Sequence, residues 1–90
     1  MSKSSNKQKM YLRSFPLTTI NDIEKIKDHV ESNNIVILRI TPIANKDVKQ
    51  LKDAVQNLYT FVESINGDIA RLGEERVVIT PPGVQVWRGL

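Results

Sequence analysis

Residues 46–65, KDVKQLKDAVQNLYTFVESI, followed by Asn66 and Gly67, decide how this chain folds. Their apolar residues recur in alternating three-residue and four-residue steps, which keep one stripe on one face of an α-helix. These residues are Val48, Leu51, Val55, Leu58, Val62 and Ile65. Asn45 is a candidate N-cap, and Gly67 or Asn66 can adopt the left-handed conformation that ends a helix. A helix of twenty residues runs about 30 Å, so the sequence predicts one long helix that spans the whole domain.

The composition is typical of one small globular domain. Of the 90 residues, 40% are apolar and 26% are charged, which is unlike a disordered chain. The chain has no cysteine, which excludes a disulfide framework and a thiolate metal site and suits a reducing cytoplasm. No apolar run approaches the roughly 20 residues of a membrane-spanning helix, and no signal-peptide pattern is visible. We therefore expect a cytoplasmic protein.

The net charge of +3 is concentrated at the N-terminus. Four basic residues precede the first acid: Lys3, Lys7, Lys9 and Arg13. We predict that residues 1–10, MSKSSNKQKM, form a disordered basic tail and that residues 11–90 form the domain. A dedicated nucleic-acid-binding protein usually carries a basic face on the fold itself, so nucleic acid is not the expected partner. A small nucleic-acid-binding protein that uses the basic tail is the alternative interpretation.

The segments before the long helix predict two strands and a first helix. Residues 35–40, IVILRI, are nearly all apolar and mostly β-branched, which is typical of a central strand covered on both faces. Residues 11–17 alternate in polarity and contain Pro16, which favours an edge strand. Between them, Asn21 is a candidate N-cap for a helix that ends near residue 33.

The segments after the long helix predict three more strands. They are residues 68–72, residues 76–80 and a short last strand over residues 84–87. The first two are joined by a tight turn and form a hairpin. The predicted fold is a two-layer α/β sandwich of order β-α-β-α-β-β-β, with two helices on one face of a small mixed sheet. Right-handed crossovers that step the same way put both helices on the same face.

This arrangement leaves the second face of the sheet without a cover. Residues 35–40 and 77–79 nevertheless have apolar side chains that point to both faces. Contiguous exposed apolar surface indicates an interaction site, and most soluble homo-oligomers are symmetric. The sequence therefore predicts a symmetric dimer that hides the second face or a sheet edge.

The residues that catalysis or cofactor binding needs are few. The lone histidine, His29, lies in the first predicted helix without a second histidine or a cysteine nearby in the sequence. The four glycines are isolated turn residues, so no phosphate-binding loop is present. We expect no enzyme activity, no metal and no cofactor. Trp87-Arg88 is the one aromatic and cation pair near the end, and it either packs on the sheet or anchors an interface.

Two segments resemble the core of SepF, the accessory protein of FtsZ-based cell division, and look most similar to its archaeal SepF-like branch. They are residues 64–73, SINGDIARLG, and residues 77–84, VVITPPGV. The family has a long helix ending in a Gly turn, an Ile-rich strand, and a hydrophobic strand ending in Thr-Pro. The resemblance covers about residues 11–88.

The resemblance implies a non-catalytic dimeric adaptor that binds the C-terminal tail of FtsZ and helps to link division filaments to the membrane at the division site. The family's usual N-terminal amphipathic anchor is not visible, because residues 1–10 have no apolar face. Assembly beyond the dimer stays open, since Tyr59-Thr60 stand where bacterial members have a small Ser-Gly pair.

For the peptide site we predict the junction between the long helix and the following strand. Phe61 and Ile69 are expected to provide apolar contact there. Lys52 and Arg71 are expected to attract an acidic tail peptide. These four residues are chosen for their predicted placement and chemistry, since no motif identifies them.

Overall fold

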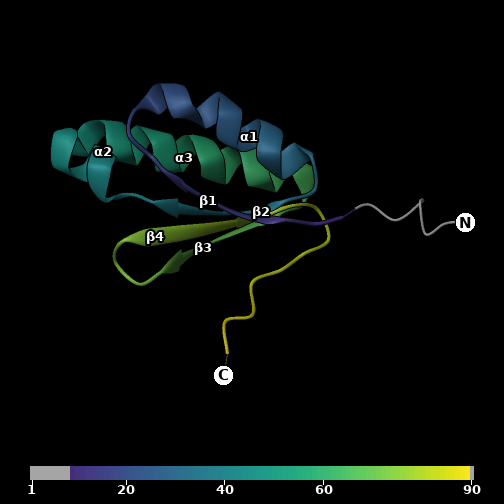
Figure 1. Cartoon of the computed structure of the whole chain (residues 1–90). Helices are drawn as coiled ribbons and strands as arrows, with labels where there is room; N and C mark the ends of the chain where they lie inside the picture. The colour runs from purple at the N-terminus through teal and green to yellow at the C-terminus, as the bar shows by residue number, and fades with distance from the viewer. Residues whose placement is uncertain (1–8, 90) are drawn as a thin grey trace, which may run out of the picture.

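Helices cover one face of a four-stranded mixed sheet in the computed structural model, which describes residues 9–89 (Figure 1). Most of the predicted tail, residues 1–8, lies outside the described residues. The elements in chain order are β1 (Leu12–Pro16), a 3-10 turn (Ile20–Asp22), α1 (Ile23–Glu31), β2 (Ile35–Arg39), α2 (Thr41–Lys46), α3 (Val48–Ile65), β3 (Asp68–Leu72) and β4 (Arg76–Thr80). The predicted class, a two-layer α/β sandwich, is confirmed.

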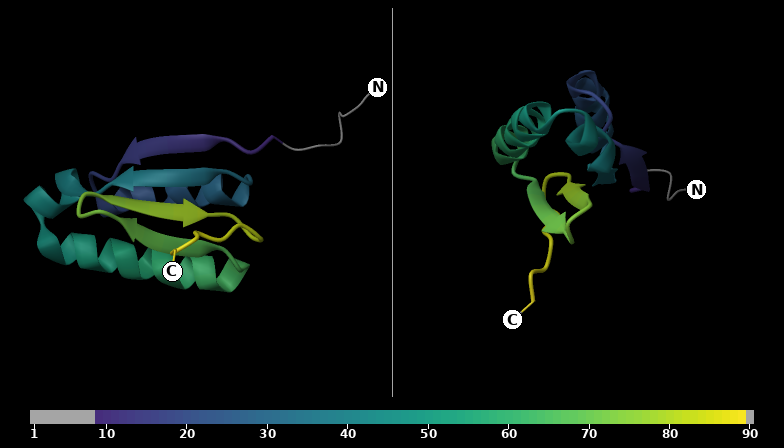
Figure 2. Two further views of the ribbon diagram at one scale, coloured as in Figure 1. Left: turned by 90° about the horizontal axis from the view of Figure 1, so that it is seen from below. Right: turned by 90° about the vertical axis from the view of Figure 1, so that its left-hand side faces the viewer.

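The sheet order is β1-β2-β4-β3, with β1 parallel to β2 and β4 antiparallel to both of its neighbours. The strands β2 and β3 consequently run in the same direction, with β4 inserted between them. Both crossovers, through α1 and through α3, step the same way across the sheet. Because such crossovers are right-handed, both helices lie on the same face, as Figure 2 shows from below and from one end.

The long helix begins later than predicted. Asp47, and not Asn45, caps α3 by accepting hydrogen bonds from the backbone N–H groups of Lys49 and Gln50 at 2.9 and 3.3 Å. Its C-terminal end agrees with the prediction, since Asn66 has a left-handed φ of 62°.

The segment before α3, for which no helix or strand was predicted, forms a short helix, α2. Pro42 lies in its first turn, where a helix needs no N–H donor and a fixed φ is favourable. The predicted cap of the first helix was also wrong. Thr19 and Asp22 form a reciprocal capping box around the 3-10 turn, so Asn21 has no capping role.

The predicted last strand, residues 84–87, does not form in the described chain. These residues alternate like a strand, but the backbone N–H of Val86 donates to the carboxylate of Asp68 at 2.9 Å. The Asp68 side chain therefore occupies a backbone N–H that a fifth strand would need for hydrogen bonding to the sheet. The sheet has four strands where the sequence predicted five.

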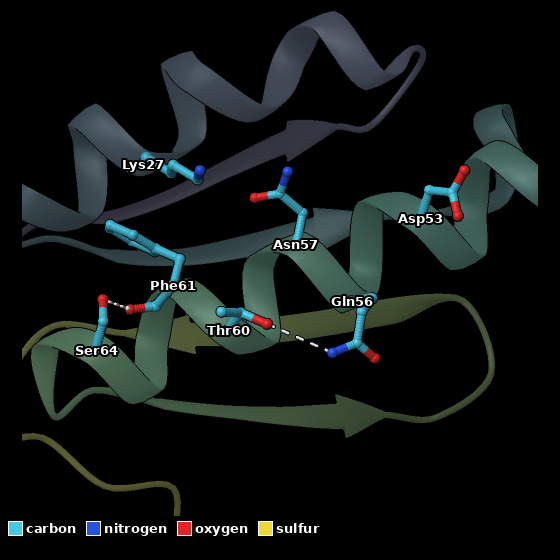
Figure 3. Close-up of a pocket in the computed structure, with 7 residues that line it drawn as sticks. All are labelled: Lys27, Asp53, Gln56, Asn57, Thr60, Phe61 and Ser64. Carbon is cyan, nitrogen blue, oxygen red and sulfur yellow. Dashed lines mark hydrogen bonds between the residues drawn. The ribbon is translucent and has the colours of Figure 1, made fainter.

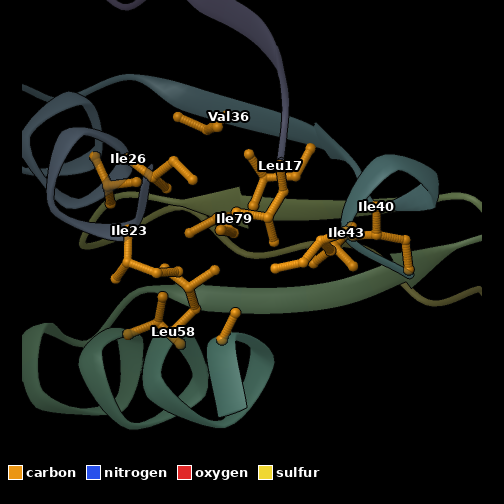
Figure 4. Close-up of a cluster of buried hydrophobic side chains, with 13 residues drawn as sticks. Leu17, Ile23, Ile26, Val36, Ile40, Ile43, Leu58 and Ile79 are labelled. Carbon is orange, nitrogen blue, oxygen red and sulfur yellow. The ribbon is translucent and has the colours of Figure 1, made fainter. Parts of the chain in front are cut away.

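The core lies between the helices and the sheet (Figure 4). The two longer helices each contribute one apolar stripe: Ile23, Ile26 and Val30 from α1, and Ala54, Leu58 and Val62 from α3. From the two central strands, Val36, Leu38, Val77 and Ile79 point into the core, each at most 2% exposed.

The other face of the sheet, which we call the open face, is covered by no helix in the described chain, and only the C-terminal segment passes on that side (Figure 1). Strand alternation places every second residue there. Its apolar side chains are Leu12, Ile35, Ile37, Val78, Ala70 and Leu72. Ile37 and Val78 are cross-strand neighbours and are only partly buried. The expectation of apolar residues on both faces is thus confirmed.

Candidate functional site

The junction between α3 and β3, which we call the α3–β3 seam, contains two adjoining hollows on the helix-covered side of the sheet. The larger, of about 480 Å³, extends from Ile40 and Leu51 to Arg71. The smaller, of about 170 Å³, lies between Tyr59 and Ile69. Val55 and Arg71 line both hollows, so together they form one continuous surface beside the edge strand β3.

The seam has an apolar floor and a positively charged rim. Most of its apolar lining comes from α3 and β3, including Val48, Leu51, Val55, Tyr59 and Ile69. The rim carries the exposed cations Lys52 and Arg71, and no acidic side chain from the described part of the chain lines either hollow. The Arg71 guanidinium donates a hydrogen bond to the backbone carbonyl of Glu74 at 3.2 Å, which holds it along the hairpin. This combination suits an extended segment with apolar side chains and negative charge.

Three of the four predicted site residues lie in the seam, and one does not. Lys52, Ile69 and Arg71 line its hollows as expected. Phe61 instead lines a groove between α1 and α3, where the Lys27 ammonium lies 5.5 Å from the centre of its ring (Figure 3).

Phe61 lies outside the seam because of the helical period of α3. Tyr59 follows Val55 by four residues and so faces the same way. Phe61 lies two residues after Tyr59, so its side chain is rotated by about 200° around the helix axis relative to Tyr59 and faces α1 instead. Sequence reasoning missed Val55 and Tyr59, although their four-residue spacing was visible.

The groove between α1 and α3, of about 560 Å³, is larger than either hollow of the seam alone. Some of its polar side chains already form hydrogen bonds within α3. Ser64 donates its hydroxyl to the carbonyl of Phe61 at 2.6 Å, and the Gln56 amide donates to the Thr60 hydroxyl at 3.4 Å (Figure 3). It also carries both a cation and an anion, Lys27 and Asp53, so it has no charge preference. The seam is the better candidate for an acidic peptide.

A second cluster of charge lies at the start of β3, where the C-terminal segment returns to the sheet. The guanidinium of Arg88 donates to both carboxylate oxygens of Asp68 at 2.8 and 3.0 Å. Together with the N–H of Val86, this bidentate contact holds the pKa of the Asp68 carboxyl well below its usual range. Hydrogen bonding to Asp68 likewise raises the pKa of Arg88.

This contact predicts a specific pH dependence of stability. The lowered pKa means that ionised Asp68 stabilises the folded state above its unfolded pKa of about 3.9, and that this stabilisation is lost as the pH falls below that value. Asp68→Asn should lower the free energy of unfolding at neutral pH by about 1–2 kcal/mol. Urea unfolding measured from pH 7 down to pH 2 should show the two proteins converging below about pH 4. A constant difference across this range would contradict the role assigned to the charge.

Trp87 does not pack on the sheet, so that interpretation of the Trp87-Arg88 pair is wrong for the single chain. Its side chain is 82% exposed. Within residues 9–89 there is no group of acidic or histidine side chains arranged to hold a metal ion. No helix of this described part is long and apolar enough to cross a membrane.

Sequence comparison connects most of the folded region to one family. The family model described as cell division protein SepF matches residues 14–86. The cell division protein SepF of Haloferax volcanii is 33% identical over 67 residues, which cover 74% of this chain and 56% of that protein. The chain thus spans a little over half the length of this curated relative.

Solved structures agree with the sequence match. A SepF-like protein from Archaeoglobus fulgidus superimposes with a TM-score of 0.83 at 32% identity, over 89% of this chain and 95% of that one. One from Pyrococcus furiosus gives a TM-score of 0.81 at 27% identity, over 91% and 99% of the two chains. SepF from Methanobrevibacter smithii, solved in complex with FtsZ-CTD, has the same fold, with a TM-score of 0.75 at 22% identity over 90% of this chain and all of the other. The matched segment, the fold and the archaeal SepF-like neighbours lead to one conclusion: the chain belongs to the SepF family of cell division proteins.

Proposed function

We propose that this protein is a non-catalytic dimeric adaptor that binds the C-terminal tail of FtsZ in the α3–β3 seam. Its place of action would be the division site, on the cytoplasmic side of the membrane. The observation that carries the proposal is the seam itself, an apolar surface whose charged lining residues, among residues 9–89, are the cations Lys52 and Arg71. The family membership and the Methanobrevibacter smithii complex with FtsZ-CTD support the choice of partner.

The seam would bind an extended tail through two kinds of contact. Apolar side chains of the tail would fill the hollow between Tyr59 and Ile69, which holds about 170 Å³. Carboxylates of the tail would pair with Arg71, whose planar guanidinium is suited to bidentate contact. An adaptor works through binding alone, so this mechanism requires no nucleophile, metal or cofactor.

The proposed dimer follows from the open face. A small domain with half-buried Ile37 and Val78 at the centre of an uncovered sheet gains stability when a second copy covers them. Two copies would place two seams on one particle, and two binding sites raise the effective affinity for a filament that presents many tails. Dimerisation therefore contributes directly to the adaptor function.

The direct test is a calorimetric titration of the purified protein with a peptide of the FtsZ C-terminal tail from the same cell. Saturable binding near one peptide per subunit is the expected result. Absence of heat and of any shift in a parallel fluorescence titration, with the protein shown to be folded, would contradict the assignment of FtsZ as partner.

We predict that Arg71→Glu weakens binding of this peptide about tenfold, because it replaces attraction by repulsion at the rim of the seam. Lys49→Glu is the matched control, since it makes the same charge change on exposed α3 surface outside both hollows. Calorimetry of both variants in the same buffer separates a local contact from a general effect of net charge. Equal losses in the two variants would remove Arg71 from the site.

A further inference from the structure

The C-terminal segment, residues 84–89, is held in place without joining the sheet, and we call it the strap. The hydroxyl of Thr80 donates to the carbonyl of Val84, and the N–H of Val86 donates to Asp68. Arg88 then forms the bidentate contact with Asp68 and donates to the backbone carbonyl of Ile69 at 2.9 Å. The strap is thus anchored at three points along its length.

These bonds also close part of the outer edge of β3. The N–H of Ile69 donates to the carboxylate of Asp68 at 2.9 Å, while its carbonyl accepts from Arg88. Both backbone groups of Ile69 are therefore occupied by side chains. The strap cannot add to its own sheet as a fifth strand there, even though its sequence alternates like one.

The strap lies on the open-face side of the sheet, opposite the helices (Figures 1 and 2). On it, Trp87 is 82% exposed, the largest exposure among the large apolar side chains described. On the same side, Leu12 and Leu72 of the open face are 67% and 53% exposed. An exposed indole on an anchored backbone segment and an apolar sheet face thus lie on one side of the same protomer. Within the described residues, neither is covered by a helix.

The occupant that fits both features is a second copy of this chain. In an isologous contact each subunit supplies the same surface, so one two-fold axis lets each indole reach the other copy's open face. The open face also carries Arg39 and Arg76 as directly opposed cross-strand neighbours, a like-charge pair that is unfavourable alone. An indole is the side chain best suited to cover such cations through its π face.

We propose that the strap is a dimerisation arm, which the Asp68–Arg88 contact positions so that Trp87 packs on the open face of a second copy. This inference rests on the proposed dimer and adds to it the anchoring residue and the contact that fixes its position. Trp87 fits the anchor role because a large buried aromatic side chain supplies much of the binding energy of an interface.

Trp87 is the only tryptophan of the chain, so its fluorescence reports on its environment without interference. The full chain would be diluted from millimolar to submicromolar concentration, with sedimentation equilibrium and emission spectra recorded on the same samples. We expect the emission maximum to lie at shorter wavelength in the dimer and to shift to longer wavelength on dilution, with the same midpoint as dissociation.

The matched variants are Trp87→Ala and Gln85→Ala, both at exposed strap positions. Trp87→Ala should raise the dimer dissociation constant about 30-fold or more, as expected for an anchor residue, while Gln85→Ala should change it less than about twofold. Circular dichroism would verify that both variants keep the fold. Arg88→Ala, which frees the strap but keeps the indole, should give an intermediate increase.

The outcomes distinguish the proposed role of the strap from the proposed dimer on which it rests. A dimer whose tryptophan emission stays solvent-like, or whose dissociation constant is unchanged in Trp87→Ala, would overturn the role of the strap and leave the dimer standing. A monomer at every concentration would overturn both. Peptide binding in the seam is measured independently by calorimetry, so neither result depends on FtsZ.

Discussion

Replacement of Gly67 by alanine is expected to lower the free energy of unfolding by about 2–3 kcal/mol. A Cβ added at Gly67 would overlap the backbone carbonyl oxygen of Thr80, the last residue of β4. Backbone atoms in a sheet cannot move aside as the end of a flexible side chain can. The clash also lies between Asn66, which ends α3, and Asp68, which holds the strap, so repair by local movement would disturb both.

Gly73→Ala is the control that separates crowding from backbone conformation. Gly73 has a φ of 74° but nothing within 4 Å of an added Cβ, so its substitution should cost only the left-handed strain, about 1 kcal/mol. Urea unfolding of both variants gives the comparison. A Gly73→Ala loss equal to or larger than that of Gly67→Ala would show that close packing at Thr80 is not what selects glycine at position 67.

Leu58→Ala is expected to produce the largest loss of stability, about 3–4 kcal/mol. Leu58 is 1% exposed at the middle of α3, inside the cluster where both helices meet the sheet (Figure 4). Its truncation removes apolar contacts and leaves a cavity that a rigid sheet cannot fill by collapse. A loss of this size is a large part of the total stability of a small domain, so partial unfolding at physiological temperature is expected.

Val48→Ala on the same helix is the matched control, because Val48 is 58% exposed and its truncation should change stability by less than about 0.5 kcal/mol. Thermal and urea unfolding at one protein concentration would measure both, since dimerisation makes apparent stability depend on concentration. Similar small losses in the two variants would mean that the core described around Leu58 does not carry the fold.

Local patterns were sufficient to predict the elements that carry the fold. The three- and four-residue spacing of apolar residues predicted α3, and the β-branched run of residues 35–40 predicted the central strand β2. The spacing of apolar residues is set by the local sequence, and a helix with one apolar face buries that face in any compact fold. The rule for crossover hand then placed both helices on one face, which the sheet order confirms.

The residues that line the candidate seam were predicted only in part. Lys52, Ile69 and Arg71, which the sequence placed near the junction of α3 and β3, all line the hollows there. Which residues of α3 face the seam depends on the helical phase, and this excluded Phe61 and added Tyr59. The apolar stripe of α3 is wide, and apolar residues lie along both of its borders. Apolar character alone therefore could not show whether Phe61 faces the seam or the groove beside α1.

The sequence by itself determined the class of the fold, the long helix, the central strands and an apolar residue pattern on both faces of the sheet, because each depends on the spacing of nearby residues. Only the tertiary structure decided that residues 84–87 do not form a strand of the sheet. Their pattern is that of a strand, but the carboxylate of Asp68 accepts bonds from Val86 and from Arg88, twenty residues away. Such a contact exists only once the chain has folded back on β3, and there charge-assisted hydrogen bonds outweigh the weak preference of four residues for a strand.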